Sequence, residues 1–397
     1  MREVTLEQRA LRGARPDGAW EVPLSDVRLP PEAIRAATEV LESGWLTSGP
    51  RVAEFEEAVA AYVGRAHAVA CSSGTAALLL AFGALGLRRG DEVAMPSLSF
   101  VAQANAAHHV GARCAFVDVA GGDDLGIAAD ALERVLTHRI RAVVVMHYGG
   151  HPCDPAVIEL ARDHGVAVVE DAAHALGAAT SAGSCGALGD LGCFSFYGNK
   201  NLPLGEGGMV VTDDDALAGR LRHLRTNGLG FAGWDRYLGA RSEYDVAVPG
   251  LNLKLDEMRS AMGTVLLARL DESIVLRAAL VAEYERRIER IEGVSLAFAG
   301  RGEPTGRSAH HLAVAILDEG IDRTGVVGKM SELGVQTGWH YPPIHLMTAY
   351  RRARRRVPRT EALAARLVTL PLYPHMSLDR LAHVADALEL AVRATDP

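Results

Sequence analysis

The chain has 397 residues, of which 49% are hydrophobic and 23% are charged, and its formal net charge is −8 at pH 7. This length and composition indicate a globular enzyme or binding protein with more than one domain, and the negative charge excludes a general attraction to nucleic acids or acidic membranes. Residues 1–18 are polar and lack the apolar core of a secretion signal, and the 5 cysteines contain no CxxC pair, so we expect a cytoplasmic protein.

The first half of the chain alternates short apolar strands with helices. Residues 1–22 lack periodicity and predict an N-terminal arm, whereas helices are expected at 31–43 and 52–63, joined by the turn GWLTSGP at 44–50. Strands are then expected at 67–71, 92–96, 114–119, 142–148 and 166–171, with helices at 75–85, 101–109, 128–136 and 155–164. This alternation is typical of a mainly parallel sheet sandwiched by helices, so we assign residues 23–255 to a large α/β domain.

The most apolar window, residues 66–87, does not predict a membrane span. Polar residues and a glycine at 71–75 interrupt it, so a strand, a turn and a helix explain it better.

The second half predicts a smaller domain. A lysine-bearing turn between strands 193–197 and 209–212 leads to a helix at 216–224 and to a glycine-rich loop at 227–244. A long helical stretch at 256–291 is expected to bridge the domains. Strands at 294–299 and 311–317, with helices at 324–333 and 378–393, predict a small α+β domain over residues 292–397.

Lys200 lies on the tight turn between two apolar strands. Loss of hydration there would disfavour the charged form of the amine and make it a nucleophile that forms Schiff bases. For a lysine taken alone, a solvated turn residue is the ordinary interpretation, so the hypothesis depends on the residues expected around it.

Hydroxyls and a glycine follow the first predicted strand in CSSGTAAL, residues 71–78. Gly74 allows close approach of the backbone, and the free N–H groups at the helix start, with Thr75, favour a phosphate. A helix cap is the alternative interpretation of this motif. Ser195 could meet the same phosphate, or could be an ordinary strand serine.

Asp171 ends the predicted strand in VVEDAAHALGA, at the sheet edge where ligands bind in open α/β sheets. Its carboxylate could cap a helix or could keep a pyridine nitrogen protonated. His174 would reach the same pocket if a helical turn begins there, and Phe100 could supply a flat face for an aromatic ring, although core packing is the alternative for both. A phosphate cradle, a ring platform, an anion and a lysine together match the requirements of pyridoxal 5′-phosphate.

The motifs SGTAAL, PSLSFVAQAN, VVEDAAHALGA, CFSFYGNKNLPLGEGG, LNLKLDEMRSAMG and GWHYPPIH resemble those of the DegT/StrS-type sugar aminotransferases, over about residues 22–395. These are fold type I pyridoxal-phosphate enzymes that work as dimers with shared active sites. The resemblance implies that Lys200 forms the Schiff base with the cofactor and that Asp171 pairs with its ring nitrogen. It further implies a stacking role for Phe100, a position near the ring hydroxyl for His174, phosphate contacts for Gly74, Thr75 and Ser195, and a phosphate contact from the partner subunit for Asn252.

Two departures from the family pattern affect the expected substrate contacts. Lys254 stands where many members have arginine, and TNGLG at 226–230 replaces a more usual His-Gly pair. The related sugar 3-dehydratases carry histidine in place of the lysine, so Lys200 argues against that branch.

The resemblance also suggests candidates for substrate binding. The segments GWLTSGP and GWHYPPIH resemble parts of the substrate entrance, which makes Trp45, Thr47, Tyr341 and His345 candidates for sugar or nucleotide contact. Turn formation and interdomain packing are the alternatives. The basic run at 351–359 is expected to be a solvated loop, with a diphosphate or partner contact as the alternative.

No metal site is expected, because glycines and a proline between and beside His147 and His151 break any helix that could pair them.

The leading functional hypothesis is therefore amine transfer from an amino acid, glutamate as in the family, to the ketone of a nucleotide-linked deoxysugar. The same chemistry on a keto-cyclitol is the first alternative. A regulatory protein that binds the cofactor without turnover is the second.

Overall fold

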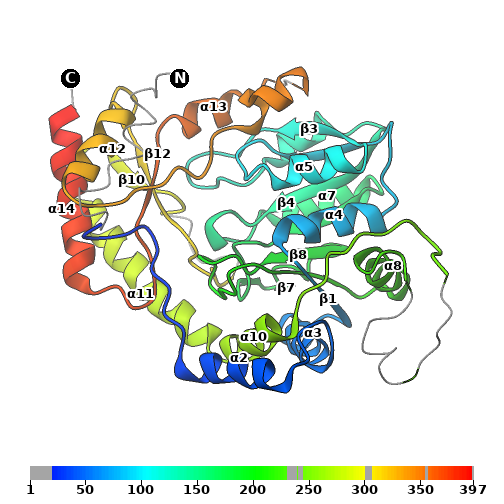
Figure 1. The fold of residues 1–397 in the computed structure, drawn as a ribbon. Coiled ribbons are helices and arrows are strands. Elements are labelled where there is room, and N and C mark those ends of the chain that lie inside the picture. Colours follow the sequence, from blue (N-terminus) through cyan, green and yellow to red (C-terminus); the bar gives the residue numbers. More distant parts are fainter. Residues whose placement is uncertain (1–19, 230–238, 240–244, 300–305, 354–355, 396–397) are drawn as a thin grey trace, which may run out of the picture.

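The structure, a computed structural model, describes residues 20–229, 239, 245–299, 306–353 and 356–395. A seven-stranded sheet with the order β1-β9-β8-β5-β4-β2-β3 forms the centre of the larger domain, on the right in Figure 1. Its strands are β1 (His67–Cys71), β2 (Glu92–Pro96), β3 (Arg113–Val117), β4 (Ile140–Met146), β5 (Ala167–Asp171), β8 (Leu191–Ser195) and β9 (Gly208–Thr212). Only β9 runs antiparallel to its neighbours among these seven, which confirms the mainly parallel sheet.

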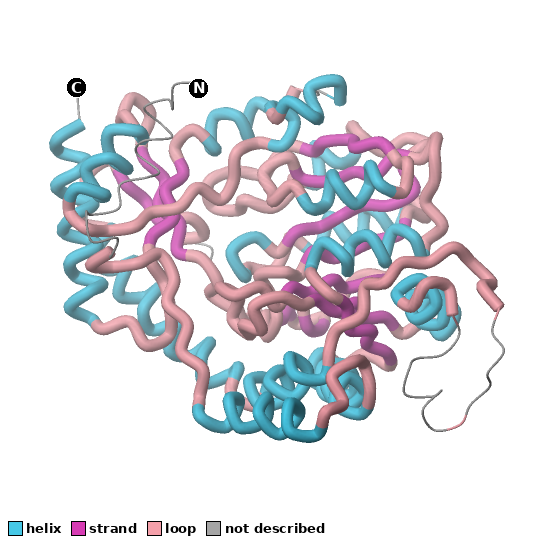
Figure 2. Tube along the Cα trace, in the orientation of Figure 1, coloured by secondary structure: helices cyan, strands magenta, loops and turns pink. Residues whose placement is uncertain are grey.

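Alternate side chains of the strands enter different layers of the core. Val93 and Met95 of β2 pack on one face of the sheet, and Ala94 between them packs on the other. The first face is covered by α4 (Gly74–Ala84), α5 (Ala102–His109) and α8 (Asp215–Arg225), and the second by α3 (Pro50–Val63), α6 (Ala129–Glu133) and α7 (Pro155–Asp163). Figure 2 shows the helices on both sides of the magenta strands, as the continuous apolar runs predict. Every helix and strand expected in this domain is present, with ends shifted by a few residues.

The second domain is built on an antiparallel three-stranded sheet of β10 (Val294–Leu296), β11 (Ala313–Leu317) and β12 (Leu367–Leu370). Helices α11 (Leu270–Ile288), α12 (Arg323–Glu332) and α14 (Leu378–Thr395) pack against it, on the left in Figure 1. The sequence analysis missed β12 and the short helix before it, α13 (Pro358–Ala364). Three apolar residues and one threonine carry too little periodicity to identify a strand.

The helical stretch at 256–291 consists of two helices. The first, α10 (Glu257–Leu267), packs on α2 (Pro31–Ser43) and α3, at the bottom of Figure 1. The second, α11, packs on α14 and β10. The break between them therefore lies where the chain passes from one domain to the other.

Residues 20–24 pack with the small domain. Glu21 and Val22 donate their N–H groups to the carbonyl of Gly334, and the Val22 side chain is fully buried in the small-domain core. The structure thus groups these residues neither with an N-terminal arm nor with the large domain, while residues 1–19 of the expected arm lie outside the described residues.

The basic run at 351–359 differs from the expected solvated loop at its C-terminal end. Helix α13 begins at Pro358, and the guanidinium of Arg359 lies 3.1 Å from a carboxylate oxygen of Asp130. The backbone N–H of Arg359 also donates to Asp118, so this residue joins α13 to the large domain. The carboxylates of Asp118 and Asp130 bind Arg359 in this way, and the run of positive charges alone did not predict these contacts.

An apolar cluster, here called the interdomain cluster, joins the two domains. It consists of Leu98, Val119, Leu125, Met146, Tyr148, Ala297, Phe298, Val314, Ile316, Tyr341, Leu363, Ala364 and Leu367. The rings of Tyr148 and Tyr341 meet edge to face at 6.4 Å, and Tyr148 donates its hydroxyl to the carbonyl of His340. These contacts hold the segment of Tyr341 against the large domain.

Candidate active site

The strands β1, β2, β5 and β8 all end at the same edge of the sheet, where a cavity of about 420 Å³ opens. Parallel strands bring the residues at their carboxyl ends together, which is why this edge is the usual ligand site of open α/β sheets. The structure brings into this cavity most of the candidates from the sequence: Gly74, Thr75, Phe100, Asp171, His174, Ser195, Lys200 and Tyr341. We call it the catalytic pocket.

The first turn of α4 forms an anion cradle. Ser73 caps the helix by accepting a hydrogen bond from the N–H of Ala76 at 3.1 Å, so the expected cap falls on this residue and leaves Gly74 and Thr75 to face the pocket. A Cβ placed on Gly74 would lie 2.7 Å from the Cβ of Ser195, which shows how closely the two backbones approach. The unpaired N–H groups of a first helical turn, together with the Ser195 hydroxyl, suit a phosphate.

Gly208 at the start of β9 makes this approach possible from the other side. A Cβ at that position would lie 2.3 Å from the carbonyl oxygen of Ser73. Only glycine therefore allows β9 to pass directly behind the cradle.

Asp171 is held in place by two donors. Its Oδ2 accepts a 2.6 Å hydrogen bond from Nε2 of Gln103, and its Oδ1 accepts from the N–H of Ala173 at 3.2 Å. Gln103 is fully buried on α5 and its Oε1 has no hydrogen-bond partner among the described residues. The carboxylate is thus fixed at the bottom of the pocket, with lone pairs left for a cationic ring atom.

Lys200 lies on a turn that backbone hydrogen bonds define at both ends. Its own N–H donates to the carbonyl of Tyr197 at 2.9 Å, and Phe196 pairs with Gly207 and Leu204 as the chain returns toward β9. Burial lowers the pKa of Lys200 to about 8, an effect that the charge of Asp171 opposes. Lys200 therefore has a larger fraction of neutral amine near neutral pH than a free lysine has, as Schiff-base chemistry requires.

His174 and Tyr341 form a polar pair on the wall of the pocket. Nδ1 of His174 accepts from the N–H of Gly149 at 3.3 Å, so the ring proton lies on Nε2, which is 2.9 Å from the hydroxyl of Tyr341. Burial, followed by the positive charge of Lys200, holds the pKa of His174 well below its usual range, so the imidazole is neutral. Because Tyr341 accepts from His174, its own O–H is free to donate into the pocket.

Phe100 provides an apolar face at the mouth of the pocket. Its side chain is 54% exposed, an unusual value for a large apolar residue, and its ring lies 6.0 Å from that of Tyr341. This exposure suits a residue whose face is covered by an aromatic ligand.

Four candidates do not line the pocket. Asn252 is exposed and forms a backbone bridge with Thr226. Thr47 is exposed, and the turn that holds Trp45 is tied to α10, because Glu257 accepts hydrogen bonds from the N–H groups that start α3. Asn252 and Thr47 are thus exposed, Trp45 is half-buried, and the fourth candidate, His345, is buried.

His345 is a correction. Its side chain is fully buried, with Nδ1 at 2.7 Å from the hydroxyl of Ser97 and Nε2 at 3.1 Å from Glu361. Both ring nitrogens are used within the core, so the expected substrate contact is wrong and the interdomain packing alternative holds.

Several pocket residues escaped the sequence analysis. Asn199, His311 and His340 line the pocket, and Gln103 supports Asp171 from behind. Gln103 lies within the recognised motif PSLSFVAQAN, which is the signal that could have identified it. His340 lies within the recognised motif GWHYPPIH, which is likewise a signal that could have identified it. His311 comes from another segment of the small domain, and no spacing in the sequence relates it to Lys200.

No group of metal-ligating side chains occurs among the described residues. Nδ1 of His147 accepts from the N–H of Cys153, so its Nε2 donates to Glu170 at 2.8 Å. Glu170 also accepts from three backbone N–H groups, those of Gly186, Leu188 and Gly189. This pair is fully buried between strands and stabilises the sheet. Within the part of the chain that the structure describes, no helix is both long and apolar enough to cross a membrane.

The residues of the pocket fit pyridoxal phosphate. The close approach at Gly74 forms a cradle that no side chain fills, Asp171 is aimed at the same space, and Lys200 supplies an amine of lowered pKa. Each group matches one part of the cofactor: phosphate, ring nitrogen and aldehyde.

Comparisons with known proteins agree with this geometry. The model of the DegT/DnrJ/EryC1/StrS aminotransferase family matches residues 28–389. The spore coat polysaccharide biosynthesis protein SpsC of Bacillus subtilis is 38% identical over 375 residues, which cover 92% of this chain and 95% of that protein.

Solved structures are similar over almost the whole chain. The aminotransferase TlmJ from Streptoalloteichus hindustanus is 32% identical with a TM-score of 0.87, and the match covers 94% of this chain and 99% of that one. DesV from S. venezuelae is 36% identical with a TM-score of 0.82, covering 91% and 94% of the two chains.

Proposed function

The chain belongs to the DegT/DnrJ/EryC1/StrS aminotransferase family and is a pyridoxal-phosphate-dependent sugar aminotransferase, and we propose that it moves an amino group from glutamate to a ketone of a nucleotide-linked deoxysugar. In net terms, the donor carbon exchanges its amine and hydrogen for the carbonyl oxygen of the acceptor. The donor becomes a 2-keto acid and the acceptor an amino sugar, so no external oxidant or reductant is needed.

The observation that carries the proposal is the meeting of Lys200 and Asp171 in one pocket with the cradle at Gly74. An amine of lowered pKa and a fixed carboxylate are the two groups that a transaminase requires at opposite ends of the cofactor ring. When bound, the cofactor supplies an electron sink that makes the bond between the donor α-carbon and its hydrogen labile.

Each side chain has a separate role in this proposal. Lys200 would hold the cofactor through its aldehyde and, as a free amine, would take up and return the proton of the donor α-carbon. Asp171 would keep the ring nitrogen protonated, and Gly74, Thr75 and Ser195 would hold the phosphate. Phe100 would cover one face of the ring and exclude water from it.

His174 and Tyr341 orient the bound groups. The hydroxyl of Tyr341 accepts from His174 and therefore presents its proton to an oxygen of the cofactor or of the acceptor. Burial raises the pKa of Tyr341 well above its usual range, so it acts as a neutral donor.

We further propose that two copies of the chain share their active sites. The exposed Asn252 lies beside β1, because the N–H of Ser72 donates to the carbonyl of Leu253 at 2.9 Å. The apolar side chains of Phe100, Tyr197 and Leu251 in the large domain are exposed, and contact with a second copy would cover such side chains. The phosphate contact assigned to Asn252 is then made in the pocket of the partner.

A coupled assay tests the function. The purified holoenzyme is mixed with glutamate and a nucleotide-linked keto-deoxysugar, and 2-ketoglutarate and the mass of the aminated nucleotide sugar are measured. We expect both products with the wild type and neither with Lys200→Met. The matched control Lys329→Met changes an exposed lysine of the small domain and should react as the wild type does.

The two alternatives give different results in the same assay. If products form with a keto-cyclitol and none form with any nucleotide-linked sugar, the acceptor is a keto-cyclitol and the proposed amino transfer still stands. A cofactor absorbance that glutamate and other amino acids leave unchanged would contradict a transaminase and favour the non-catalytic alternative.

A further inference from the structure

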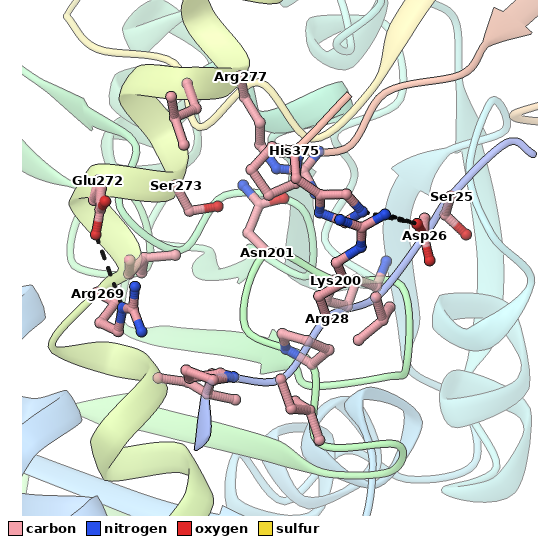
Figure 3. A pocket seen from close by; sticks show the side chains of 18 of the residues that line it. Ser25, Asp26, Arg28, Lys200, Asn201, Arg269, Glu272, Ser273, Arg277 and His375 are labelled. Atoms are coloured by element: carbon pink, nitrogen blue, oxygen red, sulfur yellow. Dashed lines mark hydrogen bonds and ion pairs between the residues drawn. The ribbon is translucent and has the colours of Figure 1, made fainter. Parts of the chain in front are cut away.

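A second pocket adjoins the catalytic pocket on the side of α11. It has a volume of about 400 Å³ and lies between residues 25–31, the Lys200 loop, the start of α11 and residues 374–375. Figure 3 shows Arg277 pointing into it from α11, with Asn201 and Lys200 across from it. We call it the α11 pocket.

Arg277 is a buried cation in this pocket. Its residue is 5% exposed, its Nη1 donates to the carbonyl of Leu372 at 3.2 Å, and its Nε has no hydrogen-bond partner in the described part of the chain. Burial lowers the pKa of Arg277 to about 10, and no carboxylate of the described residues acts against this effect. A buried guanidinium without a counter-ion is costly, and an anionic ligand would remove that cost.

Apart from Lys200, the other cations of the pocket each lie near a carboxylate. Arg28 lies 3.5 Å and His375 2.8 Å from Asp26, and Arg269 lies 3.7 Å from Glu32 and 3.8 Å from Glu272. Figure 3 shows the pairs of Asp26 and of Glu272 as dashed lines. Among the arginines that line this pocket, Arg277 is therefore the buried one without a carboxylate partner in the described part of the chain.

The α11 pocket is in contact with the catalytic pocket. Asn199 and Lys200 line both of them, and Asn201 of the α11 pocket lies 3.2 Å from Nδ1 of His311 in the catalytic pocket. Burial, and after it the positive charges of Lys200 and Arg277 among others, hold the pKa of His311 well below its usual range. A ligand that reacts at Lys200 can therefore extend toward Arg277.

We propose that Arg277 binds an oxyanion of a substrate in the α11 pocket, either a carboxylate of the amino-acid donor or a phosphate of the nucleotide-linked acceptor. A guanidinium binds both groups through the same paired N–H donors. The identity of the anion rests on the proposed function, whereas the charge of the site rests on Arg277 itself.

Equilibrium titration of the holoenzyme tests this assignment. Glutarate, which has the carboxylates of the donor without its amine, and inorganic pyrophosphate are each titrated by calorimetry into the wild type, Arg277→Met and Arg269→Met. We expect Arg277→Met to weaken binding of at least one probe on the order of 10- to 100-fold. Arg269→Met removes a paired cation of the same pocket and should change the affinity much less.

The results separate the two sources. Loss of glutarate binding alone assigns the donor carboxylate, and loss of pyrophosphate binding alone assigns the acceptor phosphate. If neither probe binds the wild type, if Arg277→Met binds both as the wild type does, or if Arg269→Met has an equal effect, the proposal is overturned.

Two further measurements keep the test decisive. If Arg277→Met does not fold, Arg277→Lys keeps the charge but loses the paired donors, and unchanged affinity in that variant would contradict the proposal. The coupled transaminase assay on the wild type is run in parallel. Failure of that assay with intact anion binding would reject the proposed reaction and leave the anion site standing.

Discussion

Tyr341 accepts the Nε2 proton of His174 across 2.9 Å, and this hydrogen bond joins the segment after β5 to a segment that belongs to the interdomain cluster. Because Nδ1 of the same imidazole already accepts from the Gly149 N–H, the direction of the bond is fixed. The pair therefore delivers a hydroxyl proton, not an imidazole proton, to the pocket.

Tyr341→Phe removes this proton and keeps the ring. We expect kcat/KM for amino transfer to fall on the order of 10- to 100-fold, because one preorganised donor to the reacting groups is lost. Tyr350→Phe is the matched control, since its hydroxyl bonds to Asn105 outside the pocket. Steady-state kinetics with unchanged kcat/KM in Tyr341→Phe would contradict the role of the hydroxyl.

Gln103→Leu leaves Asp171 without its shorter hydrogen bond. The carboxylate should then be less well placed for the ring nitrogen, and we expect the affinity of the apoenzyme for pyridoxal phosphate to fall about 10-fold. Gln103→Glu should be more harmful, because a second carboxylate would favour protonation of Asp171. Fluorescence titration with the cofactor measures both; equal dissociation constants in all three proteins would refute the supporting role.

Gly74→Ala places a Cβ within 2.7 Å of the Ser195 Cβ, so the cradle must widen. We expect weaker cofactor binding in Gly74→Ala, and partial recovery when Ser195→Gly removes the opposing atom in the double variant. Gly219→Ala on α8 is the control, since a Cβ there meets nothing within 4 Å. Absence of recovery in the double variant would show that the Ser195 hydroxyl matters more than the space.

Lys200→Met should stabilise the apoenzyme at pH 7. The folded-state pKa of about 8 lies below the value of 10.5 for a free lysine, so the unfolded chain binds more protons between these pH values. The penalty is complete below about pH 8 and disappears as the pH rises toward 10.5. We therefore expect Lys200→Met to raise the free energy of unfolding by up to about 3 kcal/mol at pH 7 and by much less above pH 10.

Urea denaturation of the apoenzymes at pH 7 and at pH 10.5 measures this difference. Lys329→Met, which changes an exposed lysine, should show no comparable pH dependence. If the stability difference between Lys200→Met and the wild type is the same at both pH values, burial does not lower the pKa of Lys200.

The sequence analysis identified those pocket residues that follow a single recognisable strand. Asp171 and Lys200 each follow a recognisable strand, and parallel strands bring their ends to one edge by geometry alone. Gln103 escaped because its hydrogen bond to Asp171 joins segments far apart in the sequence, and His311 because it arrives from the small domain. His340 was missed although it stands beside Tyr341 in the motif GWHYPPIH. Contacts between elements far apart in the chain leave no periodicity to detect.

His345 is a residue that the sequence analysis assigned to the substrate site but that the structure places in the core. Its motif resembles a substrate segment, yet Ser97 and Glu361 bind both of its ring nitrogens within the core. A histidine in a motif gives no information on which way its ring faces, whereas neighbouring Tyr341 in the same motif does reach the pocket.

Tyr341, a candidate catalytic residue, is also a member of the interdomain cluster that joins the two domains. Tyr341 packs against Tyr148 at one edge of its ring and presents its hydroxyl to the pocket. If heat disrupts the packing of the interdomain cluster, the hydroxyl of Tyr341 would be displaced while the sheet of the large domain remains intact. Thermal inactivation should therefore precede the loss of secondary structure. Substitutions that improve packing in the interdomain cluster should lengthen the half-life of activity at a raised temperature, even where they leave the melting temperature unchanged.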